Sequence, residues 1–91
     1  MEMSKLETRE DGLYIDGNKV IKGWESFSGW YWFATELEQE NYGGRPLWFG
    51  FVQGFENEWG TFWQGEFDPL IKQGRVWEIK EIDLPHAGRR N

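Results

Sequence analysis

Two glutamates beside tryptophans are the best candidates for chemistry in this sequence. Glu36 follows the aromatic run 30–35, and Glu58 directly precedes Trp59. Paired carboxylates flanked by aromatic rings are typical of sites that bind or cleave sugars, and they need a separation of about 5–10 Å. The competing interpretation, which we favour, is that both are charges at strand edges that keep the protein in solution.

The other residue types give little support for catalysis or metal binding. His86 is the only histidine and follows Pro85 near the end of the chain, with no partner nearby that would make it part of a nucleophile pair. The chain has no cysteine, which excludes a thiolate nucleophile and a thiolate-bound metal. The pair Gly43-Gly44 lacks the Lys-Ser/Thr of a phosphate-binding loop. We therefore predict no catalytic residue, no metal site and no cofactor.

Aromatic side chains supply the second set of functional candidates. Seven Trp, seven Phe and three Tyr make up 19% of the chain. A buried Trp needs a large volume and a partner for its indole N–H, so seven of them cannot all lie inside a chain of this size. We predict an aromatic core together with an exposed patch that binds a protein, a sugar or a stacked base. The candidate binding residues are Trp30, Trp32, Glu36, Trp48, Glu58 and Trp59.

The charge balance narrows the choice of partner. Sixteen acidic and ten basic residues give a formal net charge of -6, which disfavours direct nucleic-acid binding. An acidic surface suits solubility, a basic protein partner or imitation of a nucleic acid. No apolar run approaches the ~20 residues that span a bilayer, and the N-terminus lacks the apolar part of a signal peptide. With no cysteine as well, we predict a cytoplasmic protein without membrane contact.

Hydrophobic patterning predicts a fold that is mainly β. Ninety-one residues favour one domain, which we place at 12–86 between flexible tails at 1–11 and 87–91. Expected strands lie at 13–15, 20–21, 30–35, 47–52, 59–63 and 76–82. The run 30–35 has aromatic residues on both faces of its pleat, which indicates a central strand covered on two sides.

The segments between these strands contain turn and helix signals. We expect a tight turn at 16–19, an exposed loop at 36–46, and glycines 50 and 60 beside Trp rings. Asp68-Pro69 is expected to open a short helix, with Asp68 as its N-cap, and Gly74 to end it. The predicted fold class is α+β, mainly β, an antiparallel meander of five or six strands with one short helix.

The runs WYWFATE at 30–36 and WFGFVQGFENEWGTF at 48–62 resemble an uncharacterised family of small proteins encoded on plasmids and integrative conjugative elements. That family pairs a Trp-Tyr-Val-Thr-Glu-like strand with Phe-Phe-Gly-Leu-Val-x-Gly and Glu-Leu-Gly-Tyr-Phe strands, then a short helix and an acidic strand. The resemblance covers Gly29 to Leu84 and is poor over Leu13 to Phe27. It implies a mobile-element accessory protein with no assigned reaction.

We therefore expect a non-enzymatic module that binds a protein partner through an aromatic patch with an acidic rim including Glu36 and Glu58. One alternative is an anti-defence inhibitor whose carboxylates imitate DNA, which requires the glutamates at 36, 38, 40, 56 and 58 to share one face. Another is a small carbohydrate-binding or carbohydrate-active domain. The protein is expected to be a monomer, or a homodimer paired through the edge strand at 76–82.

Overall fold

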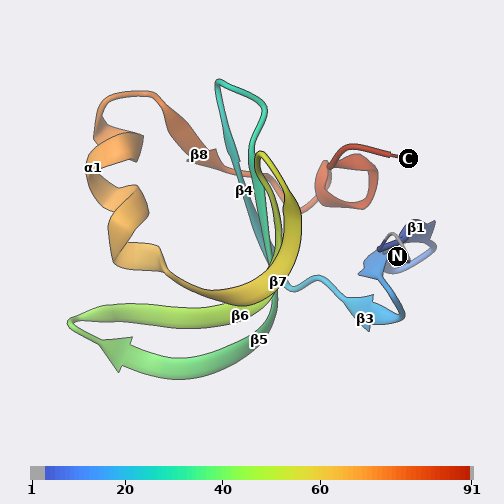
Figure 1. The fold of residues 1–91 in the computed structure, drawn as a ribbon, viewed down its shortest axis with the longest axis horizontal. Coiled ribbons are helices and arrows are strands. Elements are labelled where there is room, and N and C mark those ends of the chain that lie inside the picture. The colour runs from blue at the N-terminus through green and yellow to red at the C-terminus, as the bar shows by residue number, and fades with distance from the viewer. Residues whose placement is uncertain (1–3, 91) are drawn as a thin grey trace.

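Antiparallel strands make up most of the computed structural model, which describes residues 4–90 (Figure 1). A three-stranded sheet contains, in spatial order, β1 (Leu6–Arg9), β2 (Gly12–Ile15) and β3 (Asn18–Lys19). A five-stranded sheet contains, in spatial order, β7 (Asn57–Trp63), β6 (Arg45–Gln53), β5 (Tyr31–Tyr42), β4 (Lys22–Ser26) and β8 (Val76–Glu78). The helical elements are η1 (Gln64–Glu66), α1 (Phe67–Lys72) and η2 (Leu84–His86). The predicted fold class is confirmed: β4 to β7 form an antiparallel meander, and α1 is one short α-helix.

The five-stranded sheet is covered on both faces, and its central strand is β5, as the aromatic run predicted. α1 lies on one side of this sheet, while β1–β3 and η2 lie on the other (Figure 1). Phe33 and its neighbour Ala34 are both fully buried, and because successive side chains point to opposite faces they enter different cores. The core under the small sheet comprises Leu13, Ile15, Val20, Phe33, Phe51, Ile79 and Leu84. The core under the helix comprises Trp24, Ala34, Trp48, Phe62, Phe67 and Val76.

The predicted hairpin near the N-terminus is present with a two-residue turn. Asp16 and Gly17 have φ of 50° and 84°, and Ile15 pairs with Asn18. Two consecutive positive φ angles match the right-handed twist of a hairpin. The returning strand is β3 rather than 20–21, and Val20 instead contributes its side chain to the core.

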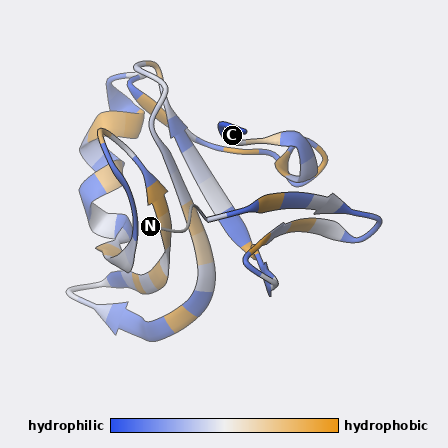
Figure 2. Ribbon diagram, turned by 45° about the vertical axis from the view of Figure 1, so that its right-hand side comes forward, coloured by the Kyte–Doolittle hydropathy of each residue, from blue (hydrophilic) through white to orange (hydrophobic). Residues whose placement is uncertain are grey.

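The expected loop at 36–46 is wrong, because β5 and β6 continue through it as a long hairpin. Their turn is Gly43-Gly44, with φ of 60° and 90°, and Tyr42 pairs with Arg45. Every residue from 36 to 45 is exposed, which leaves both faces of this stretch in solvent, and most of its residues are hydrophilic (Figure 2). A strand that is solvated on both faces lacks the alternation of apolar and polar residues by which strands are recognised, and for this reason the sequence predicted a loop.

Both ends of the described chain belong to the fold, which corrects the predicted tails at 1–11 and 87–91. Leu6–Arg9 form β1 and pair with β2. Near the C-terminus, the backbone of Arg89 is hydrogen-bonded to the side chain of Gln53. Residues 1–3 and 91 lie outside the described residues.

The helix begins and ends close to the predicted positions. It starts at Phe67, after the 3-10 turn η1, so Asp68 lies inside its first turn rather than at the N-cap. At its end Gly74 has φ of 71°, its N–H donates to Ile71 O, and Arg75 N–H donates to Leu70 O. This pair of bonds is a Schellman motif, in which a glycine satisfies the last carbonyls of the helix.

The last strand and two glycines differ from expectation. β8 spans only Val76–Glu78 of the predicted 76–82, and the chain then turns so that Ile79 enters the core under the small sheet. A Cβ on Gly50 would lie 1.8 Å from the carbonyl oxygen of Phe33, and one on Gly60 would meet nothing within 4 Å. The atoms nearest to Gly50 are thus backbone atoms of β5 and Gly60 faces open space, whereas the sequence predicted Trp rings beside both glycines.

Candidate functional site

A cluster of exposed and half-buried apolar side chains lies where the β4–β5 turn, the β6–β7 turn and α1 come together. Phe27 is 70% exposed and Phe55 is 95% exposed. Trp30 lies against Phe55, with ring centroids 5.3 Å apart, and against Trp32 at 5.8 Å. Trp32, Phe27 and Leu70 line one shallow hollow of about 190 Å³. We call the set Phe27, Trp30, Trp32, Phe55 and Leu70 the aromatic patch.

The buried core supports this patch from below. The ring of Trp32 packs edge-on against Phe67 of α1, with centroids 5.0 Å apart. Phe67 in turn lies 5.0 Å from the fully buried Trp24. The patch therefore rests on packed aromatic rings of the core, which limit how far the side chain of Trp32 can move.

The backbone beneath Trp30 is also fixed. Ser26 Oγ accepts the Trp30 backbone N–H at 3.1 Å and lies 2.8 Å from Ser28 Oγ, so the turn is closed by side chains. The indole of Trp30 lies flat on Gly54, where a Cβ would come within 2.5 Å of the ring. A glycine is thus required at position 54 for the ring to keep this position.

A charged group of each sign lies near the patch. Glu58 of β7 is the cross-strand partner of Val52, which in turn pairs with Trp32. Arg75 lines the hollow beside Phe27. The rim is mixed in charge, rather than acidic as the sequence indicated.

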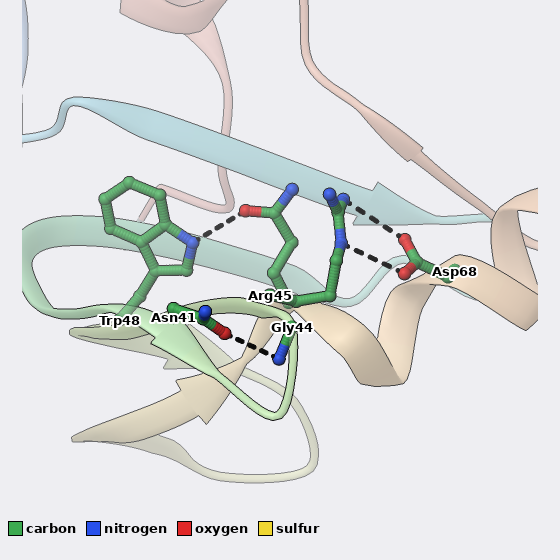
Figure 3. A network of polar contacts seen from close by, with 6 residues as sticks. Asn41, Gly44, Arg45, Trp48 and Asp68 are labelled. Carbon is green, nitrogen blue, oxygen red and sulfur yellow. Dashed lines mark hydrogen bonds and ion pairs between the residues drawn. The ribbon is translucent and has the colours of Figure 1, made fainter.

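Trp48 is not available for binding. It is 8% exposed, and its indole Nε1 donates to Gln64 Oε1 at 2.8 Å. Next to it, the Arg45 guanidinium forms two bonds with the Asp68 carboxylate, with Nε–Oδ2 at 3.1 Å (Figure 3). These contacts join the β5–β6 hairpin to η1 and α1, so Trp48 has a structural role.

Glu36 and Trp59 lie outside the patch, in a hollow between the two sheets. Trp59 stacks on Phe49 with centroids 5.9 Å apart, and its Nε1 donates to Ser4 Oγ. Glu36 lines the same hollow together with Lys19. The structure thus brings Trp30 and Trp32 together, with Glu58 two strands away from Trp32, and separately brings Glu36 and Trp59 together.

The two glutamates singled out for sugar chemistry do not converge. Glu36 pairs with Phe49 of β6, whereas Glu58 pairs with Val52 of the same strand. Because side chains alternate along β6, positions 49 and 52 face opposite sides of the sheet. The geometry gives no paired-carboxylate cleft at these residues.

A third hollow is lined in part by Tyr31, whose hydroxyl has a raised pKa. Tyr31 Oη donates to Glu25 Oε2 at 3.0 Å, and Trp77 is the cross-strand partner of Glu25 on its other side. Burial of the hydroxyl, followed by the effect of Glu25, raises the pKa of Tyr31. The hydroxyl is therefore a hydrogen-bond donor at neutral pH and not a base. His86 lines this hollow and is exposed.

Sequence reasoning missed Phe27, Phe55, Leu70 and Arg75. Phe27 and Phe55 have a recognisable signal, because each stands in a short turn next to Ser or Gly, where an apolar residue has no core to enter. Leu70 and Arg75 carry no such signal, since their place depends on how α1 packs on the sheet.

No family model, curated protein or solved structure matches the chain. Within residues 4–90, no group of three or more His, Cys, Asp or Glu side chains could hold a metal ion. The helices of the same part of the chain are all too short or too polar to cross a membrane. The resemblance to mobile-element proteins stays a prediction.

Proposed function

We propose that this protein is a non-enzymatic interaction module that binds a protein partner through the aromatic patch. The observation that carries the proposal is the exposure of Phe27 and Phe55 beside Trp30 and Trp32, of which Trp32 packs on the buried Phe67. Large exposed rings are unfavourable in water, and grouped rings are the usual centres of protein interfaces. We further propose that this activity takes place in the cytoplasm.

The construction of the patch supports binding of a structured partner. Trp30 and Trp32 are held by Ser26, Gly54 and Phe67, so little side-chain freedom is lost when a partner covers them. The mixed rim of Glu58 and Arg75 can set the orientation of a partner through charge.

The two alternative functions receive less support. Glu36 and Glu58 face opposite sides of the sheet, which speaks against carbohydrate hydrolysis at this pair. The acidic side chains required for DNA imitation are also spread out. Glu40 is near the tip of the β5–β6 hairpin, whereas Glu56 is in the β6–β7 turn, at the end where Tyr31 pairs with Gln53.

Site-specific photo-crosslinking in the native cells tests the proposal. A benzophenone amino acid at position 55, in the patch, is compared with one at Ile82, which is 82% exposed and is not part of the patch. We expect a discrete covalent adduct with one protein from position 55 and none from position 82. Adducts of equal yield at both positions, or none at position 55, would refute the proposal.

A further inference from the structure

β7 is an edge of the five-stranded sheet that is suited to pairing. Within residues 4–90, no strand is hydrogen-bonded to its outer side. Proteins usually block such edges with bulges, prolines, charges or short strands. β7 has seven residues without proline, pairs with β6 without a register shift, and carries one charge, Glu58. The other edge, β8, has only three residues and ends at Glu78. The dimer pairing predicted through 76–82 would therefore have few strand residues available for hydrogen bonding.

Gly60, in the middle of β7, is not required by the chain's own fold. Its φ is outside the left-handed region, and a Cβ added to it would meet nothing within 4 Å. Gly50 and Gly54 differ, because a Cβ there would clash with Phe33 or Trp30. A glycine inside a strand weakens it and often marks a place where another backbone approaches closely. Gly60 therefore points to a contact outside this chain.

We infer that β7 pairs antiparallel with β7 of a second copy, with the two-fold axis at Gly60. At such an axis the central residue of one copy faces the same residue of the other copy. Glycine avoids a steric clash there because it has no side chain. The register places Trp59 opposite Thr61 of the second copy, an aromatic residue beside a β-branched one. It also places Glu58 opposite Phe62, so that no like charges face each other across the pair.

This surface includes none of the five residues of the aromatic patch, although Glu58 of the rim belongs to β7, and the proposal does not depend on a partner binding at the patch. Each copy carries a formal net charge of -6, so the copies repel each other at low salt. Screening by salt shortens the range of that repulsion. Self-association through β7 should therefore strengthen as the salt concentration rises, whereas binding of a basic partner should weaken.

Single cysteines test the register directly, because the chain has none of its own. Gly60→Cys places two cysteines opposite each other across the axis, within reach of a disulfide. Thr61→Cys is the matched control, since position 61 faces position 59 of the other copy. On mild oxidation we expect a disulfide-linked dimer from Gly60→Cys and little from Thr61→Cys. Equal linkage from both variants, or preferential linkage at position 61, would overturn the proposal.

Charge exchange at the same position provides a second test in solution. Sedimentation equilibrium should show a reversible dimer of the unmodified chain, and Gly60→Glu or Gly60→Lys alone should weaken it by about twofold to fivefold. An equimolar mixture of the two variants should restore dimerisation. The open space at Gly60 leaves room for the Glu or the Lys side chain in the monomer of each variant. A chain that stays monomeric at every concentration and salt would overturn the proposal, as would a dimer lost on Phe55→Ser but unaffected by Gly60→Glu.

Discussion

The side-chain amide of Gln53 is hydrogen-bonded to both backbone groups of Arg89. Gln53 Nε2 donates to Arg89 O at 2.9 Å, and Gln53 Oε1 accepts from Arg89 N–H at 2.7 Å. Gln53 is fully buried, so the amide replaces a strand partner for the last described segment of the chain. The neighbouring Gly88 lies against Phe33, so this segment helps close the core under the small sheet.

Replacing Gln53 should detach this segment. Gln53→Leu keeps the volume but leaves the Arg89 N–H and C=O without partners, and we expect the free energy of unfolding to fall by about 1–3 kcal/mol in urea titrations. Arg89→Ala is the control, since it keeps both backbone bonds and removes only the side-chain bonds to Gly54 and Asn57. A larger loss from Arg89→Ala than from Gln53→Leu would contradict this role.

Gly54 and Gly60 provide a matched pair of substitutions. Gly54→Ala forces a methyl group against the Trp30 ring, and we expect a loss of about 1–3 kcal/mol in unfolding free energy together with a change in Trp fluorescence. Gly60→Ala meets only open space and, measured on dilute protein, should be neutral or stabilise by up to about 1 kcal/mol. Equal effects of the two substitutions would show that Trp30 does not rest on Gly54.

The parts of the fold that follow from local pattern could be predicted from the sequence, and those that depend on distant contacts could not. Leu13 and Ile15 alternate with Tyr14, and all four residues of 30–33 are aromatic, so the strand, the hairpin and the central position could be predicted. Leu6–Arg9 lack apolar alternation because they pair at an edge, mostly in solvent. Arg89 is held through its backbone groups, and such a contact could not be predicted because it does not depend on the type of side chain at position 89.

The same division explains the site. Trp30 and Trp32 were identified as candidate binding residues because the chain is rich in large rings. The same reasoning also selected Trp48, which is buried in the core under the helix and bonded to Gln64. Which Trp is exposed depends on strand register and on the placement of α1. Glu36 and Glu58 could not be assigned to opposite faces without knowing the bulge in β5 between Ala34 and Glu36.

Stability should depend on pH through Asp16. Its carboxylate accepts the Lys5 backbone N–H at 2.8 Å, and this bond, followed by one from Ser4, lowers the pKa of Asp16 below its ordinary value of 3.8. A lowered pKa in the folded state stabilises the protein above the unfolded value, and this contribution is lost as the pH falls through the folded value. The stability advantage over Asp16→Asn should therefore be present at neutral pH and vanish below the folded pKa. Urea midpoints measured from neutral to acidic pH check this, and a constant difference would contradict it.

The contacts in Figure 3 should differ in their contributions. Gln64→Met leaves the buried Trp48 indole N–H without an acceptor, and we expect a loss of about 1–3 kcal/mol in unfolding free energy. Arg45→Met breaks an exposed ion pair with Asp68, which should cost about 0–1 kcal/mol. Thermal or urea unfolding of both variants decides this, and the reverse order would show that the ion pair holds the hairpin.

Binding of the protein captured at position 55 tests the central claim most directly. Isothermal titration with that purified partner is carried out on the unmodified chain, on Phe55→Ser and on the control Ile82→Ser, since both side chains are exposed and neither supports the core. We predict that Phe55→Ser raises Kd about tenfold or more, as for the centre of an interface, and that Ile82→Ser leaves it unchanged. Equal Kd values for all three proteins would contradict docking through the aromatic patch.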